Sequence, residues 1–119
     1  STQQAEVYSY AAASIIDSVI EGFNGTIFAY GQTASGKTHT IEGAVGYVLS
    51  EQSAIIARMV KHVFDAIAGF YENVEFRIKV SLVELYMEKL RDLLDFNKQD
   101  LKIRSDKKRG IFIEDLTEN

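Results

Sequence analysis

Hydrophobic residues recur at helical spacing in two long segments of the chain. Over residues 1–21 the apolar positions lie three and four residues apart, which predicts one helix that ends before Gly22. Over residues 50–67 the spacing is more regular and predicts a helix that begins near Ser50 and ends before Gly69. The apolar residues of this second helix are expected to be core: Ile55, Ile56, Met59, Val60, Val63, Phe64 and Ile67.

Shorter patterns predict strands and a hairpin. Residues 26–30 form an uncharged run bounded by turn residues, which predicts a strand buried on both faces, as in a parallel sheet. Residues 76–82 alternate apolar and polar and predict a half-buried strand, and a short helix is expected over 88–94. Residues 101–104 and 111–113 flank a charged turn and predict a hairpin. The predicted fold class is therefore α/β.

Composition narrows the class of protein. A chain of 119 residues with 46% hydrophobic and 25% charged residues suits one globular domain. The absence of Cys excludes disulfide scaffolds, Cys-ligated metal and Cys nucleophiles, and no apolar run is long enough to span a bilayer. The net charge of −4 argues against a general nucleic-acid binder. We therefore expect no membrane insertion and no nucleic-acid partner.

A glycine-rich loop carries the candidate chemistry. Residues 31–38 match the phosphate-binding pattern G-x-x-x-x-G-K-[ST] without a gap. Glycines let several backbone N–H groups point at one centre, the lysine reaches the β- and γ-phosphates, and the hydroxyl ligates Mg²⁺. An apolar strand before the loop and a helix after it are also predicted, as the motif requires. The candidate residues are Gly31, Gln32, Thr33, Ala34, Ser35, Gly36, Lys37 and Thr38.

The sequence around this loop resembles one family. Residues 22–40 (GFNGTIFAYGQTASGKTHT) closely resemble the kinesin motor domain, and so do 54–58, 80–86, 91–95 and 103–117 further along. The resemblance extends over nearly the whole chain. It implies a P-loop NTPase-type three-layer sandwich, with a mixed sheet and helices on both faces. It also implies that residues 1–119 form a single partial motor domain of an ATP-driven microtubule motor.

The resemblance assigns roles near the loop. ATP or ADP would bind with Mg²⁺ at Thr38, and His39 would lie beside the adenine ring, although an ordinary polar residue is the alternative for that histidine. Residues 42–52 would be a variable loop near the nucleotide. Ala54 and Ala57 stand where the family usually has Gly and Pro, which is why the following helix is expected to begin early.

A basic cluster lies at the tip of the predicted hairpin. Lys107, Lys108 and Arg109 follow one another there, and two interpretations stay open. The cluster is either a solvated turn or a surface that steers docking, because the equivalent hairpin of the family lies against the acidic surface of tubulin. The resemblance implies microtubules as the partner and a place in the cytoplasm on the microtubule cytoskeleton, including the spindle or kinetochore.

Several family elements have no counterpart in these 119 residues. The first strand, the Ser-Ser-Arg-rich first switch and the Asp-Leu-Ala-Gly-x-Glu second switch are not found. We therefore expect this segment to bind nucleotide weakly without turnover, because the groups that position water are missing. A switchless module that holds nucleotide or tubulin without cycling is the alternative. The isolated chain is expected to self-associate, and its subfamily, conventional or centromere-type, stays open.

Overall fold

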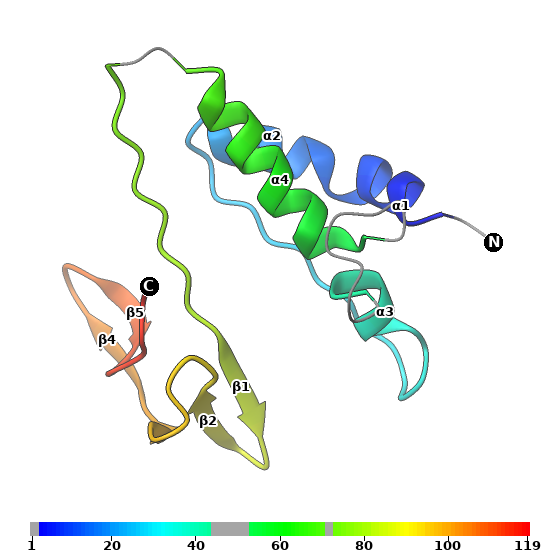
Figure 1. Cartoon of the computed structure of the whole chain (residues 1–119). Helices are drawn as coiled ribbons and strands as arrows, with labels where there is room; N and C mark the ends of the chain where they lie inside the picture. Colours follow the sequence, from blue (N-terminus) through cyan, green and yellow to red (C-terminus); the bar gives the residue numbers. More distant parts are fainter. Residues whose placement is uncertain (1–2, 44–52, 71–72) are drawn as a thin grey trace. The chain divides into compact units, whose positions relative to one another are not determined.

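The computed structural model describes residues 3–43, 53–70 and 73–119. The chain divides into two compact units, Ser1–Val74 and Glu75–Asn119. All the described helices belong to the first unit and all the described strands to the second (Figure 1). No helix among the described residues is long and apolar enough to cross a membrane.

The N-terminal helical segment is two helices rather than one. Helix α1 (Gln4–Ala11) and helix α2 (Ala13–Ile20) meet at Ala12, whose φ of −124° departs from helical geometry. The single helix predicted over residues 1–21 is therefore wrong in its continuity. Ala12 is fully buried, and its carbonyl still accepts hydrogen bonds from the N–H groups of the third and fourth residues after it. The chain thus bends at a small buried residue and continues as a helix.

Helix α4 (Ile55–Ala68) begins later than the sequence predicts. Ser53 and Ala54 are not helical, and Ala54 has the extended backbone of an N-cap residue. The Arg58 Nε donates a 2.7 Å hydrogen bond to the Ser53 carbonyl, which holds the chain outside the helix at this point. The early start is therefore wrong, although Ser50 itself lies outside the described residues. The end before Gly69 is confirmed.

The core of the first unit is small. Ala12, Ile16, Ala54 and Ile55 are its buried hydrophobic residues among those described. The prediction that the apolar face of α4 is core holds for Ile55 but not for Ile56, Val60 and Phe64, which are exposed. The reason is that α1 and α2 cover only one side of α4, where Ile55 lies.

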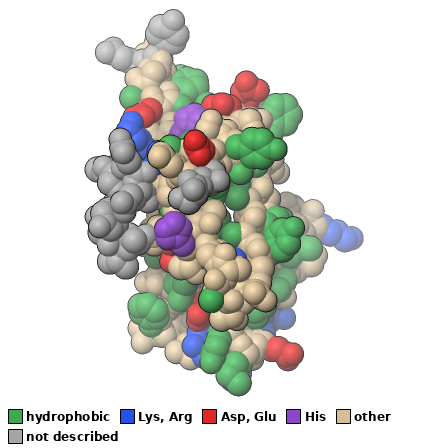
Figure 2. All heavy atoms as spheres, turned by 90° about the vertical axis from the view of Figure 1, so that its right-hand side faces the viewer, with side chains coloured by type: hydrophobic (Ala, Val, Ile, Leu, Met, Phe, Trp, Pro, Cys, Tyr) green, Lys and Arg blue, Asp and Glu red, His purple; other side chains and the backbone are tan. Residues whose placement is uncertain are grey.

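The segment 23–31 runs extended without forming a strand. No described segment pairs with it, and Phe28 and Tyr30 are 84% and 92% exposed. The predicted strand over 26–30, buried on both faces, is therefore wrong for this chain, because a strand requires a hydrogen-bonded neighbour. Figure 2 shows hydrophobic side chains (green) at the surface of one face of the molecule.

The second unit holds two small antiparallel sheets. Strands β1 (Val83–Tyr86), β2 (Lys89–Asp92) and β3 (Gln99–Leu101) form one sheet in that order. Strands β4 (Ile103–Asp106) and β5 (Gly110–Ile113) form the other. The second sheet confirms the predicted hairpin, with Asp106 opposite Gly110 and Ile103 opposite Ile113.

Two other predictions for this unit are wrong. The short helix expected over 88–94 is strand β2, because Met87 and Glu88 form a two-residue turn that folds β2 back onto β1. The strand expected over 76–82 is an exposed, unassigned segment. Within it, Val80 exchanges backbone hydrogen bonds of 2.7 and 3.0 Å with Asn119, and the Leu82 carbonyl accepts one of 3.0 Å from the Leu93 N–H.

Candidate functional site

The glycine-rich loop adopts a backbone that ordinary residues rarely take. Gly31, Ala34 and Gly36 have φ of +152°, +64° and +94°. The Ser35 N–H donates to the Gln32 carbonyl at 3.2 Å, which closes a turn inside the loop. Positive φ values within a short loop turn successive N–H groups toward one side, which is the geometry of an anion-binding nest.

The two glycines are required for different reasons. A Cβ at Gly31 would lie 2.5 Å from the Ser35 Oγ, so a side chain there would displace the Ser35 hydroxyl as well as strain the backbone at its φ of +152°. A Cβ at Gly36 would meet no atom within 4 Å, so this glycine is needed for its left-handed φ. The G-x-x-x-x-G spacing thus has a steric cause at its start and a conformational cause at its end.

Lys37 folds back over the loop. Its Nζ donates hydrogen bonds of 2.7 Å to the carbonyls of both Gly31 and Gln32. The Lys37 ammonium group is therefore held against the Gly31 and Gln32 carbonyls, within the stretch of the chain that has positive φ values. An ammonium group held beside turned N–H groups forms a compact positive site that suits phosphate oxygens.

The helix after the loop is short. Helix α3 (Lys37–Ile41) has five residues, and the Thr40 hydroxyl donates to the Gly36 carbonyl at 3.0 Å within its first turn. The helix predicted after the loop is confirmed in place, but its end at Ile41 leaves little helix dipole. The anion site therefore depends on the loop backbone and Lys37.

Thr38 is the residue that the sequence predicts to ligate Mg²⁺. Its side chain is exposed directly after Lys37. No group of three or more His, Cys, Asp or Glu side chains suited to a metal occurs among the described residues. One hydroxyl fits Mg²⁺ only when phosphate oxygens and water supply the remaining ligands, which is the usual way in which nucleotide sites bind this ion. The residues present fit that arrangement.

His39 is held by a residue from the other end of the unit. The Gln4 Nε2 lies 2.8 Å from the His39 carbonyl and 3.2 Å from its Nδ1. Gln4 opens α1 and His39 lies in α3, so the contact joins the two helices. The ring itself is exposed.

A cavity of about 300 Å³ lies behind the loop. Apolar side chains of α1, of residues 27–30 and of α4 form most of its wall, with Ser35, Gly36 and Lys37 at one end. The cavity is therefore a packing space beneath the loop that borders the exposed segment 23–31. The loop that the sequence predicts to bind phosphate contributes Ser35, Gly36 and Lys37 to the lining of this cavity.

The basic hairpin tip has its own internal order. The Asp106 Oδ1 accepts hydrogen bonds of 2.7 and 3.1 Å from the N–H groups of Lys108 and Arg109, which lower the pKa of this carboxyl. The Arg109 guanidinium lies over the Phe112 ring at 4.1 Å. Lys107 and Lys108 form no ion pair with a described residue and are exposed. The structure thus places all three predicted cations at one hairpin tip. Of the three, Arg109 is held in place by its contact with Phe112.

Comparison with known proteins decides the family. The family model of the kinesin motor domain matches residues 1–119, which is the entire chain. The chain belongs to the kinesin motor domain family. The α/β fold class predicted from the sequence is confirmed by a solved structure of a fast kinesin, which matches with a TM-score of 0.90 at 31% identity. That match covers 99% of this kinesin chain and 33% of the other.

Curated kinesins are similar over almost the same span. The kinesin heavy chain of Drosophila melanogaster is 50% identical over 115 residues, and the kinesin-1 heavy chain of Homo sapiens is 49% identical over 118. The alignments cover 97% and 99% of this kinesin chain. They cover 12% of each heavy chain, so the chain spans a small part of the length of these relatives.

The structure of this kinesin chain also reveals residues that sequence reasoning missed. Gln4 touches His39, and Tyr8 and Asp17 both bind His62. No motif marks these pairs, because their members lie on separate helices and meet only through packing.

Proposed function

We propose that this chain is the nucleotide-binding segment of a microtubule motor that couples ATP hydrolysis to movement along microtubules. The observation that supports it best is the loop geometry, in which Lys37 Nζ lies 2.7 Å from the carbonyls of Gly31 and Gln32 above a backbone with repeated positive φ. Membership of the kinesin motor domain family gives this geometry its context. The solved fast kinesin is described in terms of its ATPase mechanism and its interactions with microtubules.

Each loop residue has a role in this proposal. The backbone N–H groups of residues 32–38 bind phosphate oxygens of ATP or ADP, and Lys37 exchanges its two carbonyl acceptors for the β- and γ-phosphates. Thr38 contributes its hydroxyl to Mg²⁺, which neutralises phosphate charge when bound. His39 lies beside the adenine ring. Gly31 and Gly36 supply the close approach and the left-handed turn that the phosphates require.

The segment by itself binds nucleotide without turnover in this proposal. Hydrolysis requires groups that orient the attacking water and stabilise charge on the transferring phosphoryl group. The loop supplies Lys37 and backbone donors, and neither switch motif occurs in the 119 residues. The motor activity then belongs to a protein in which switch segments accompany this one.

The partner proposed for the second unit is the microtubule. Lys107, Lys108 and Arg109 project at one hairpin tip, and exposed cations attract an acidic surface over about 10 Å at 0.1 M ionic strength and over about 30 Å at 0.01 M. The proposed location is accordingly the cytoplasm, on microtubules. The spindle or kinetochore belongs to the same proposal if the protein is a mitotic motor.

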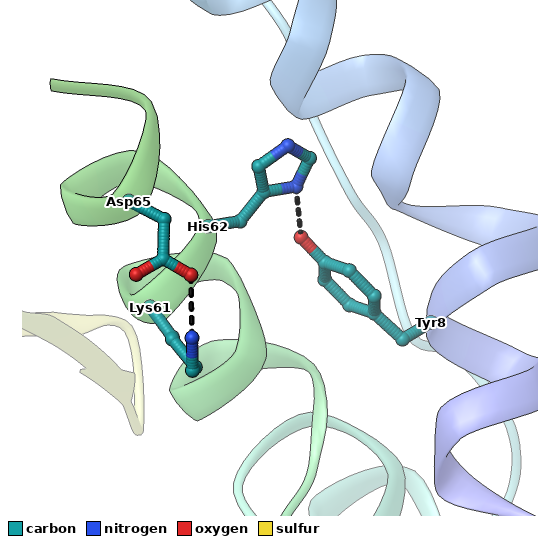
Figure 3. A network of polar contacts seen from close by, with 4 residues as sticks. All are labelled: Tyr8, Lys61, His62 and Asp65. Carbon is teal, nitrogen blue, oxygen red and sulfur yellow. Dashed lines mark hydrogen bonds and ion pairs between the residues drawn. The ribbon is translucent and has the colours of Figure 1, made fainter. Parts of the chain in front are cut away.

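Nucleotide titration tests the proposal. A fluorescent ADP analogue with Mg²⁺ is titrated into the chain, into Lys37→Ala and into Lys61→Ala. Lys61 is the matched control because it lies on α4 of the same unit and pairs with Asp65 one turn along that helix (Figure 3). We expect Lys37→Ala to weaken binding at least about tenfold, since charge-assisted contacts to phosphate are lost, and Lys61→Ala to leave it unchanged.

The other outcomes are equally informative. Equal binding by the chain and by Lys37→Ala would contradict a role for the loop. Saturable binding combined with no ATP hydrolysis by the longest natural form of the protein would favour the switchless module, which holds nucleotide without cycling.

A further inference from the structure

The Gln4 side chain makes two contacts with one residue far along the chain. Its Nε2 lies 2.8 Å from the backbone carbonyl of His39 and 3.2 Å from the His39 Nδ1, across 35 positions. Gln4 is half-buried, whereas His39 is exposed. The exposed ring is therefore anchored by a partner whose own position is fixed by packing.

The start of α1 is itself held in place. The backbone N–H of Gln3 donates to the Glu6 Oε2 at 3.1 Å, which is the reciprocal bond of a capping box. Gln4 is the first residue of the helix that follows this cap. The Gln4 backbone is therefore already ordered, and only the rotamer of its side chain has to be fixed for the contact with His39 to form.

The two contacts together fix the tautomer of His39. A carbonyl oxygen accepts hydrogen bonds and never donates, so the Gln4 atom facing it is the amide nitrogen. The same nitrogen faces Nδ1, so Nδ1 accepts and the ring proton lies on Nε2. One glutamine therefore sets both the plane of the imidazole ring and the nitrogen that presents a donor to solvent.

We propose that Gln4 is a positioning residue for nucleotide binding, which holds His39 in the orientation and tautomer that receive the base. This inference rests on the proposed function, in which His39 lies beside the base while the loop holds the phosphates. His39 directly follows Lys37 and Thr38 on α3, so a ring held there borders the phosphate site. A ring ordered before binding loses less side-chain freedom when the nucleotide arrives.

The tautomer provides the first test. The chain is labelled with ¹⁵N-histidine, and His39→Ala assigns the signals of the two histidines. We expect His39 to carry its proton on Nε2 in the unchanged chain and to become a mixture of tautomers in Gln4→Ala. His62, which binds Tyr8 and Asp17, serves as the internal reference.

Gln3→Ala is the matched control for a purely structural role. It perturbs the same helix start without touching His39. A tautomer change in Gln3→Ala equal to that in Gln4→Ala would overturn the inference, because loosening of α1 would then suffice. A mixture of His39 tautomers in the unchanged chain would overturn it as well.

Nucleotide affinity provides the second test. With the fluorescent ADP analogue and Mg²⁺, we expect Gln4→Ala to weaken binding roughly two- to fivefold, as loss of one pre-ordered side chain implies. Gln4→Ala should have no further effect in a His39→Ala background, because the glutamine acts through the histidine. Equal weakening in both backgrounds, or no weakening at all, would overturn the positioning role.

The two tests separate the inference from the function on which it rests. If the unchanged chain binds no nucleotide, the proposed function fails for this chain, and the positioning role fails with it even where the tautomer is fixed. If the unchanged chain binds but Gln4→Ala leaves both the tautomer and the affinity unchanged, the positioning role alone is wrong.

Discussion

Tyr8 Oη and His62 Nδ1 lie 2.7 Å apart and join α1 to α4 across 54 positions (Figure 3). The other ring nitrogen, Nε2, lies 3.0 Å from the Asp17 Oδ1 on α2. A carboxylate at Nε2 favours the proton there, which leaves Nδ1 to accept from the Tyr8 hydroxyl. Partial burial raises the pKa of Tyr8, and the Asp17 charge raises it further, so the phenol stays a donor. One imidazole therefore ties together helices α1, α2 and α4.

Removal of the Tyr8 hydroxyl tests this tie. We expect Tyr8→Phe to lower the free energy of unfolding by about 1 kcal/mol, because the half-buried His62 Nδ1 loses its donor while the ring packing is kept. Urea denaturation followed by far-ultraviolet circular dichroism measures the change, since all the described helices lie in this unit. Tyr10→Phe is the control, because Tyr10 is 94% exposed. Equal effects of the two substitutions would show that the hydrogen bond contributes nothing.

A buried carboxylate organises the second unit. Asp92 is fully buried, and its oxygens accept hydrogen bonds from the N–H groups of Leu94, Asp95 and Thr117 at 2.8, 3.1 and 2.7 Å. Burial raises the pKa of Asp92, but these hydrogen bonds, those from Thr117 foremost, outweigh it and lower the pKa from 3.8 to about 2. The contacts tie strand β2 to the C-terminal segment.

The lowered pKa of Asp92 predicts that the second unit loses stability as the pH falls. The folded state binds the Asp92 proton more weakly than the unfolded state, so the carboxylate stabilises the fold above pH 3.8. That stabilisation is lost as the pH falls from 3.8 through about 2. In Asp92→Asn we expect lower stability at neutral pH and a smaller loss over that acid range. The amide signals of Leu94 and Thr117, followed during urea denaturation, report this loss of stability. Asp100→Asn is the control, because the Asp100 carboxylate is exposed.

The sequence predicted correctly those parts of the fold that depend on the backbone preference of a single residue, such as a glycine at a turn or at a helix end. The glycine-rich loop has the positive φ values that its glycines imply, and the β4–β5 turn ends at Gly110 with φ of +72°. Helix α4 ends before Gly69, where the apolar period stops. In each case one residue type with a special backbone preference fixes the outcome, so its position is visible in the sequence.

Features that depend on distant partners were predicted poorly. The run 26–30 is apolar enough for a buried strand, yet a strand forms only where another segment supplies hydrogen bonds. Strand β2 was predicted as a helix because nothing in the dipeptide Met87–Glu88 signals a turn. The contact between Gln4 and His39 has no sequence signal, since the two residues lie 35 positions apart on separate helices. Sequence therefore indicated the phosphate loop but not the residue that orients its neighbour.

The β1–β2 turn predicts a stabilising double substitution. Met87 and Glu88 have φ of +48° and +61°, the two left-handed positions of a type I′ hairpin, which Asn-Gly fills best. Left-handed backbone costs an ordinary residue roughly 1–2 kcal/mol, and the extra entropy of glycine offsets roughly half of the relief. We expect Met87→Asn with Glu88→Gly to raise the free energy of unfolding by about 1 kcal/mol, as measured by urea denaturation at the amide signals of Leu85 and Leu90.

Glu88→Ala is the matched control for this turn. It removes the same charge but keeps a side chain at a left-handed position, so it should give no comparable gain. A gain in Glu88→Ala equal to that of the double variant would assign the effect to charge rather than to backbone conformation.

Charge reversal at the hairpin tip tests the proposed microtubule contact. Lys107→Glu with Lys108→Glu should weaken binding to polymerised tubulin about tenfold at low ionic strength, because two exposed attractions become repulsions. Arg109 is left unchanged, since it lies over Phe112 and its removal would disturb the hairpin itself. The difference should shrink as salt is added, because surface charges are screened within about 8 Å at physiological ionic strength. Co-sedimentation across a salt series measures both effects.

The control carries the same charge change elsewhere in the second unit. Arg77→Glu with Lys89→Glu reverses two other exposed cations outside the tip. If both double variants lose affinity equally, net charge rather than the tip governs binding. If the tip variant binds as the unchanged chain does at low salt, the three cations form a solvated turn and the microtubule contact lies elsewhere. A loss that ignores salt would instead indicate that the substitutions damaged the β4–β5 hairpin, which the amide signals of Ile103 and Ile113 would reveal directly.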